Sequence, residues 1–112
     1  LQTEFYHNGA WVGGGSGALA PTAVSSISSN ITLANKILYL VDTTAVRTLT
    51  LPAPSADLFI MIKDATGTMF TNNIQLTTPG AETIDGVAGP YALDGDYNTF
   101  WIFSDGTNYF LN

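Results

Sequence analysis

Three apolar segments follow one another between residues 37 and 64, and each has the length and composition of a β-strand. The first, ILYLVD (37–42), and the third, LFIMIKD (58–64), are almost continuously apolar, whereas VRTLTL (46–51) alternates. Short runs rich in β-branched and aromatic residues, bounded by turn formers, are typical of strands. Pro52 and Pro54 end the second segment because proline has no backbone N–H to donate. The pattern predicts strands near 37–42, 46–51 and 58–63.

The second half of the chain predicts three more strands, at 73–77, 98–104 and 107–111. No stretch keeps a helical period, and turn signals recur roughly every 8 to 12 residues, as in all-β domains. We therefore expect an all-β fold, a small antiparallel β-sandwich or β-prism-like module. The expected buried core consists of Leu38, Leu40, Leu49, Leu51, Phe59, Met61, Ile74, Leu76, Ile84, Trp101 and Ile102.

Residues 1–17 read as a separate unit that precedes this module. An aromatic pair comes before Asn8-Gly9, the pair that type I′ hairpin turns favour, and another aromatic follows it. Residues 13–17, GGGSG, are typical of a flexible linker, natural or introduced for expression. Residues 103–109 repeat the order of an aromatic, an Asp-Gly pair and an aromatic. We therefore interpret residues 1–17 as the end of a preceding, similar module and residues 18–112 as the β-rich module; the alternative is that the two hairpins share turn chemistry by chance. Because the first residue is Leu1, we expect a piece of a longer protein.

The composition and net charge of the chain disfavour some classes of binding partner. Charged residues make up 11% of the 112 residues, against about 25% in ordinary soluble domains. Such a surface suits uncharged ligands or self-association. The net charge of −6 disfavours nucleic acid and anionic membrane surfaces, because both require cationic side chains. The chain has no cysteine, and it has no apolar run long enough to insert into a membrane as a helix.

Several short motifs occur in a fixed order, with YLVDTT and RTLTLP followed by IKDxxG, NNIQL, ETIDG and a closing DGTNY. Their order and spacing resemble the modules of tailed-bacteriophage tail fibres and tailspikes, and the resemblance covers residues 31–112. It implies a β-rich structural or receptor-binding module of the virion, usually trimeric and not an enzyme by itself. The host partner would be a cell-surface polysaccharide or an outer-membrane receptor. The alternative is a carbohydrate-binding module of a bacterial surface protein or glycosidase.

The aromatic segment 98–104 independently indicates a need for a partner. Alternate residues of a strand face opposite sides, so Phe100 and Ile102 share one face and Trp101 and Phe103 the other. A strand that is apolar on both faces is buried twice or packs against another subunit. We therefore expect a homotrimer, with the number three supplied by the resemblance.

No residue grouping indicates catalysis or a cofactor. His7 is the only histidine and has no serine and carboxylate arranged with it as in a triad, so we expect a solvated loop residue. A glycosidase needs two carboxylates facing each other roughly 5 to 10 Å apart. The acids instead lie in predicted turns, where aspartate binds nearby amides; these are Asp42, Asp64, Asp85, Asp94 and Asp105.

The segment Asp94-Gly95-Asp96-Tyr97-Asn98 leaves two interpretations open. Its oxygen ligands alternate as in a calcium loop, but the sixth position is Thr99 rather than glycine, which favours an ordinary turn and no metal. Aromatic rings in loops can also stack on sugars. Tyr91, Tyr97 and Asn98 are therefore our candidate glycan-binding residues.

Overall fold

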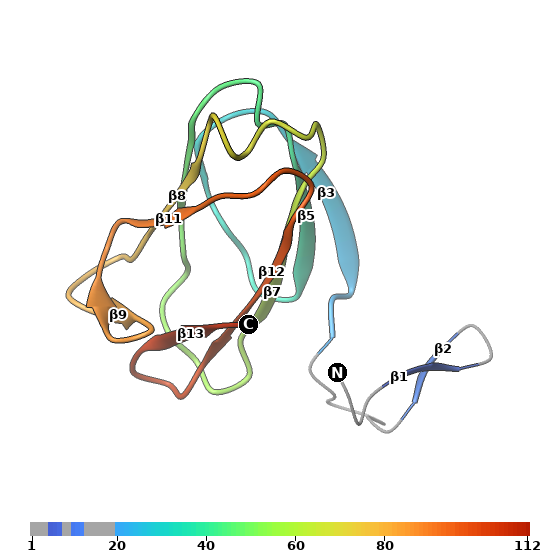
Figure 1. The fold of residues 1–112 in the computed structure, drawn as a ribbon. Coiled ribbons are helices and arrows are strands. Elements are labelled where there is room, and N and C mark those ends of the chain that lie inside the picture. Colours follow the sequence, from blue (N-terminus) through green and yellow to red (C-terminus); the bar gives the residue numbers. More distant parts are fainter. Residues whose placement is uncertain (1–4, 8–9, 13–19) are drawn as a thin grey trace.

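The structure is a computed structural model that describes residues 5–7, 10–12 and 20–112 (Figure 1). Every regular element in these residues is a β-strand, which confirms the all-β prediction. A seven-stranded sheet has the order β10 (Val87–Ala88), β9 (Thr83–Ile84), β13 (Tyr109–Leu111), β12 (Thr99–Ser104), β7 (Phe59–Asp64), β5 (Ile37–Val41) and β3 (Ala23–Ile27). A four-stranded sheet has the order β11 (Tyr91–Leu93), β8 (Ile74–Thr77), β6 (Arg47–Thr50) and β4 (Ile31–Thr32). The remaining strands, β1 (Phe5–His7) and β2 (Ala10–Val12), pair antiparallel with each other.

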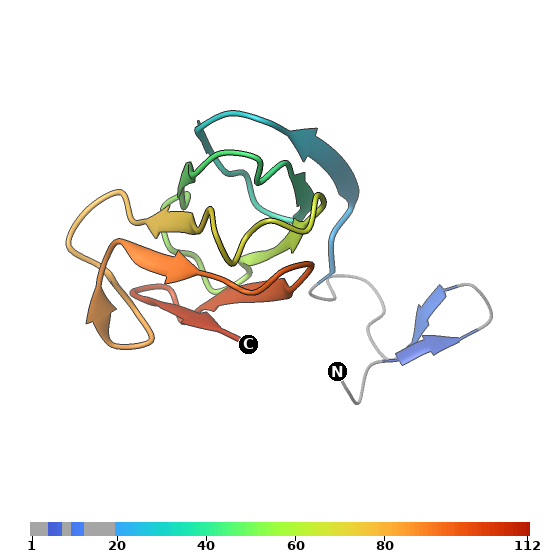
Figure 2. The ribbon, with the colours of Figure 1, turned by 45° about the horizontal axis from the view of Figure 1, so that its top comes forward.

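The chain alternates between the two large sheets as it runs from β3 to β8. Strands β3, β5 and β7 are therefore parallel neighbours in one sheet, and β4, β6 and β8 are parallel neighbours in the other. These six strands form three turns of a short β-helix, which is seen partly end-on in Figure 2. The chain then reverses, and β11 and β12 pair antiparallel with β8 and β7.

The sheets are thus mixed, which corrects the expectation of antiparallel pairing. Strands β5 and β6 are close in sequence, but the corner at residues 42–46 carries the chain across to the other sheet. A corner of this kind lets both strands bury one face against the same core. A hairpin would instead have placed them side by side in one layer.

The core lies between the two large sheets. The large sheet contributes inward side chains such as Tyr39, Ile60 and Ile102, and the small sheet contributes Leu49 and Leu76, all buried. The predicted core residues that are buried are Leu49, Leu51, Phe59, Ile74, Leu76, Ile84 and Ile102. The others, Leu38, Leu40, Met61 and Trp101, are half-buried and lie outside the core cluster. They alternate with core residues along β5, β7 and β12, so they point to the opposite face of the large sheet.

All six predicted strands are present, each with boundaries within two residues of the prediction. The structure adds β3, β4, β9, β10 and β11, most of them only two or three residues long. Strand β3 precedes the first predicted strand and pairs with β5. The predicted turn at Asn8-Gly9 and the linker 13–17 lie outside the described residues.

Candidate functional site

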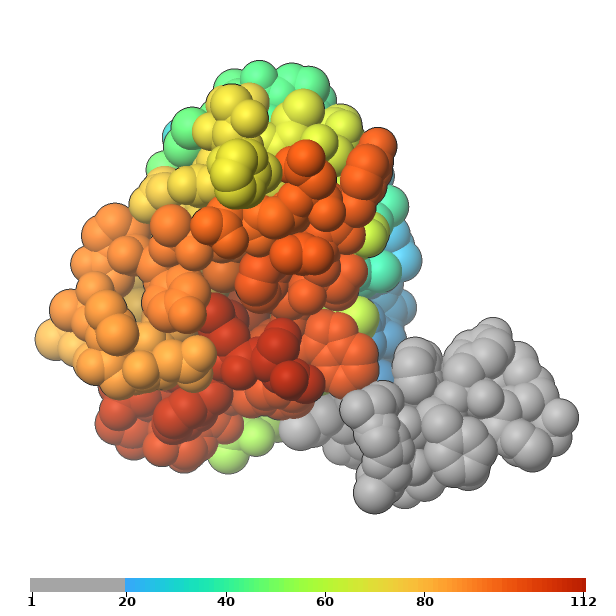
Figure 3. Space-filling model, viewed as in Figure 1, coloured from blue at the N-terminus to red at the C-terminus, as the bar shows by residue number. Residues whose placement is uncertain are grey.

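Three loops meet at one end of the fold. Strands β5 and β7 are parallel and finish at Val41 and Asp64, and β12 starts beside the end of β7. The corner 42–46, the loop 65–73 and the loop 94–98 therefore lie together, at the top of Figure 1, and we call this region the Asp64 end. Figure 3 shows the yellow 65–73 loop and the orange 94–98 loop as one continuous surface.

The buried carboxylate of Asp64 holds these loops together. Its Oδ1 accepts hydrogen bonds from the Thr43 hydroxyl at 2.7 Å and from the amides of Thr66 at 3.1 Å and Gly67 at 3.0 Å. Its Oδ2 accepts the amides of Met69 at 3.1 Å and Tyr97 at 2.8 Å. Five donors from three segments thus converge on one side chain that is shielded from solvent. The arrangement fixes the loops to each other.

The hydrogen bonds also decide the charge of this carboxylate. Burial raises the pKa of Asp64, but the Thr43 hydroxyl and the amides of Tyr97, Thr66 and Met69 favour the ionised form more strongly. The net effect lowers the pKa from 3.8 to about 2. The side chain is therefore a permanent anion at neutral pH, and its role here is to order backbone rather than to transfer protons.

Thr43 extends this network to the corner after β5. The Thr43 hydroxyl lies 3.0 Å from the Thr66 hydroxyl and 2.8 Å from the Thr68 hydroxyl. The Thr43 carbonyl accepts the Thr68 hydroxyl at 2.7 Å and the Asn72 side-chain amide at 2.9 Å. The loop 65–73 is thus bound to the corner along most of its length.

Tyr97 is held in an unusual backbone conformation with its ring outside. Its φ is +60°, a region that non-glycine residues seldom adopt. The amide is bound by Asp64, and the carbonyl accepts the Lys63 ammonium group, which also lies 5.8 Å from the ring centroid. The ring rests over Gly67, where any Cβ would overlap it. The side chain is still 58% exposed.

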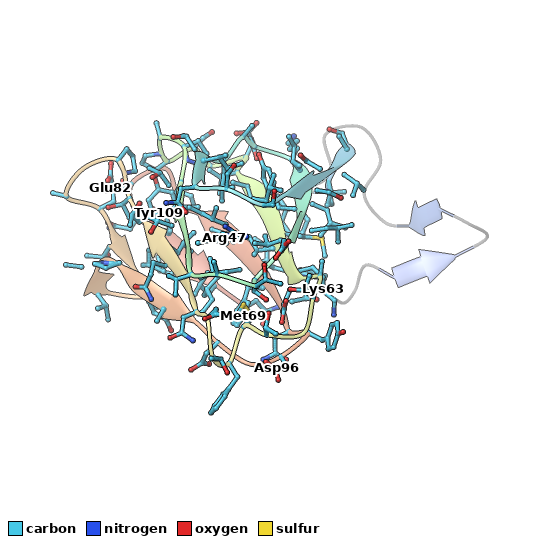
Figure 4. All side chains as sticks on the ribbon, turned by 90° about the horizontal axis from the view of Figure 1, so that it is seen from above. Arg47, Lys63, Met69, Glu82, Asp96 and Tyr109 are labelled. Carbon is cyan, nitrogen blue, oxygen red and sulfur yellow. The ribbon has the colours of Figure 1, made fainter. Side chains whose placement is uncertain are left out.

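Phe70 is the second exposed aromatic of the Asp64 end. Its amide donates to Asp96 Oδ1 at 2.9 Å, and its carbonyl accepts the side-chain amide of Asn73 at 3.3 Å. The preceding Met69 is fully buried, so the turn is anchored on both sides of the ring. Phe70 itself is 73% exposed. Figure 4 shows Lys63, Met69 and Asp96 at this end of the molecule.

The structure separates the three predicted glycan-binding residues. Tyr97 and Asn98 are exposed at the Asp64 end, where the Asn98 side-chain amide donates to the Asp94 carbonyl at 3.2 Å. Tyr91 instead lies in β11 opposite Leu76, and it is half-buried against the core. Phe70 did not stand out in the sequence. Its signal was a single aromatic inside the polar turn TGTMFTNN.

The other aspartates serve mostly as turn formers. Asp42 accepts the Thr44 amide at 2.8 Å, and Asp105 accepts the amides of Thr107 and Asn108, both at 2.9 Å, as predicted for turn residues. Asp85 differs, because it reaches the amide of Leu111 in a distant strand at 3.1 Å. Within the described residues no three acidic or histidine side chains gather as metal ligands would. The described residues contain no helix long and apolar enough to cross a membrane. The structure describes the strand assignment of His7 and not its side chain, so the expectation of a solvated residue stays a prediction.

Comparison with known proteins adds no identification. No protein family model matches the chain, and no curated protein matches its sequence.

Proposed function

We propose that this chain is a virion structural module of a phage tail fibre or tailspike that assembles as a homotrimer and contributes to host-surface attachment. The observation that carries the proposal is the apolar outer face of the seven-stranded sheet. This outer face consists of the apolar side chains that point away from the core, namely Val24, Leu38, Leu40, Phe59, Met61, Trp101, Phe103 and Phe110.

Strand register makes the outer face continuous. Val24, Leu38, Met61 and Trp101 lie opposite one another in a row across four strands. Phe59, Phe103 and Phe110 form a second row across three strands, in the same register.

Aromatic packing ties the two rows together. The ring centroid of Phe59 lies 5.5 Å from that of Trp101, edge to face, and 5.3 Å from that of Phe103. Phe59 is only 4% exposed and yet does not belong to the core cluster. The outer face therefore has a packed centre of its own.

Further copies of the same chain are the occupants that fit this face. Contiguous apolar patches on soluble proteins usually mark interfaces. The five strands of the outer face carry one outward-pointing charge, Lys63. Closed cyclic symmetry would present the same patch around one axis. The net charge of −6 on each chain opposes assembly weakly, because salt screens charges beyond about 8–10 Å.

The exposed rings of Phe70 and Tyr97 favour a second candidate, a carbohydrate-binding module. That function would not require assembly. It predicts a monomer that binds glycan by itself, whereas the fibre module is a trimer.

Light scattering on the full chain distinguishes the two. We expect a mass about three times the 11.9 kDa of one chain. Met61→Glu places a charge in the centre of the outer face, so it should reduce the mass to that of one chain. Val46→Glu is the matched control, because Val46 is exposed in the corner 42–46 and should leave the mass unchanged. A wild-type mass near 11.9 kDa up to high concentration contradicts the trimer.

A further inference from the structure

We propose that Phe70 and Tyr97 form an aromatic platform that binds a neutral oligosaccharide at the Asp64 end. The inference deepens the proposed role in attachment, on which it rests, by naming the site and the ligand class. Two aromatic side chains from adjoining loops project into solvent here, and the Phe70–Asp96 hydrogen bond joins those loops.

Both rings are attached to backbone that is already fixed. The Tyr97 amide is bound to buried Asp64, and the Tyr97 ring rests over Gly67. Phe70 follows fully buried Met69. The side-chain amide of Asn73 donates hydrogen bonds to the carbonyls of Met69 and Phe70. A ligand that contacts these rings would therefore order little additional protein, and preorganisation of this kind raises affinity.

The surroundings of the rings suit a sugar. Asp94, Asp96 and Asn98 are exposed beside Tyr97, and Thr71 is exposed beside Phe70. Small-molecule sites commonly combine aromatic surface with a few polar groups that fix orientation. Here the rings would stack on the C–H faces of sugar rings, and the carboxylate, amide and hydroxyl groups would bind sugar hydroxyls.

Charge favours a neutral sugar over an anionic one. Lys63 is the only lysine or arginine after Arg47, and its ammonium group already contacts the Tyr97 carbonyl and ring. Asp94 and Asp96 add negative charge to the same loops. An anionic glycan would meet repulsion here, since Arg47, in the neighbouring corner, is already paired with Asp42.

A protein partner is a poorer fit to the same two rings. Protein interfaces bury about 800 Å² on each side around an apolar centre. Phe70 and Tyr97 instead lie in loops whose other exposed residues are mostly polar, in contrast to the continuous apolar rows of the outer face.

Affinity electrophoresis of the full chain through gels that contain polysaccharides tests the platform. The neutral probes are dextran, mannan and galactomannan, and the anionic probes are alginate and hyaluronan. We expect at least one neutral polymer to retard the protein and neither anionic polymer to do so. Tyr97→Asn and Phe70→Ser should each weaken the retardation at least tenfold. Asn tolerates the positive φ of Tyr97, so this variant keeps the backbone while it removes the ring.

Two further variants control the result. Tyr97→Phe keeps the ring and should keep most of the binding. Val87→Ser removes an exposed apolar side chain from β10, outside both surfaces, and should bind like the wild type.

Each remaining outcome decides between the two proposals. A trimer that no neutral polymer retards overturns the platform and leaves the assembly standing. Retardation of a protein that scatters as a monomer supports the platform and overturns the trimer. Undiminished binding by both ring variants, or tighter binding of alginate or hyaluronan, overturns the platform.

Discussion

Neighbouring residues of the seven-stranded sheet face opposite ways and meet different surroundings. Ile62 and Ile102 point toward the four-stranded sheet and are fully buried. Met61 and Trp101 are adjacent to them in sequence and directly opposite each other across the strand pair, yet they are half-buried. The chemical character of the two faces is the same, and only one of them is covered by a second layer of residues 20–112.

This difference shows what an apolar strand requires. Strands that are apolar on both faces occur where both faces are covered, as in parallel sheets. The inner face gains its partner when the chain winds between the two sheets. The outer face carries its own apolar rows, and it is where we propose that another subunit packs.

The largest expected effect is a difference in stability between variants of Ile102 and Trp101. Ile102→Ala should lower the free energy of unfolding by about 2–5 kcal/mol at every protein concentration, because it leaves a cavity in the core. Trp101→Ala should cost less in dilute protein and more in concentrated protein, where the proposed trimer would contribute to stability. Denaturant titrations at two concentrations measure both variants. Equal losses that do not depend on concentration would remove the distinction between the faces.

A second prediction concerns Asp64, where the inward row of β7 ends in a charge rather than an apolar side chain. Asp64→Asn should lower the free energy of unfolding by about 1–3 kcal/mol, because one oxygen that accepts amides becomes a donor that faces them. Urea titration at neutral pH measures the loss. Asp42→Asn is the matched control at an accessible turn, and its cost should be smaller.

The same side chain sets a pH dependence. The folded state lowers the pKa of Asp64 from 3.8 to about 2, so its ionised form stabilises the fold above the unfolded value. This contribution, about 2 kcal/mol, is lost as the pH falls from about 5 to below 2. Asp64→Asn should lack this part of the acid destabilisation. If wild type and variant lost stability in parallel over that range, Asp64 would not be the group responsible.

Alternation of apolar and polar residues was enough to place the strands but not to pair them. The run ILYLVD predicts a strand, yet nothing local in it distinguishes a hairpin with 46–51 from parallel pairing with β7. That choice depends on contacts between residues distant in sequence. The inner and outer faces were indistinguishable for the same reason, since Met61 and Ile62 are both apolar. The outer face became visible only through the register of five strands.

The candidate site was predictable in part. Tyr97 and Asn98 stood out as an aromatic and an amide in a glycine-containing loop. The burial of Asp64 could not be inferred, because aspartate in a turn is ordinarily exposed, and its donors come from segments 21 and 33 residues away as well as from its own turn. Phe70 was missed because an isolated aromatic in a polar turn gives no indication of which way it points.

The smallest expected effect is the difference between alanine substitutions at two glycines. It tests whether the fold holds the Tyr97 ring as firmly as the inner face holds its side chains. Gly67 and Gly86 have nearly the same φ, +76° and +79°, but only at Gly67 would a Cβ overlap the ring; Gly86 has open space. Each change to alanine should cost about 1 kcal/mol for the left-handed backbone. Gly67→Ala should in addition displace the Tyr97 ring, which NMR detects as a change in the ring-proton shifts, and weaken retardation by neutral polysaccharide. Gly86→Ala should leave both unchanged. Identical spectra and binding for the two variants would show that the ring is not held over Gly67. The Tyr97 ring of the platform would then not be preorganised for binding.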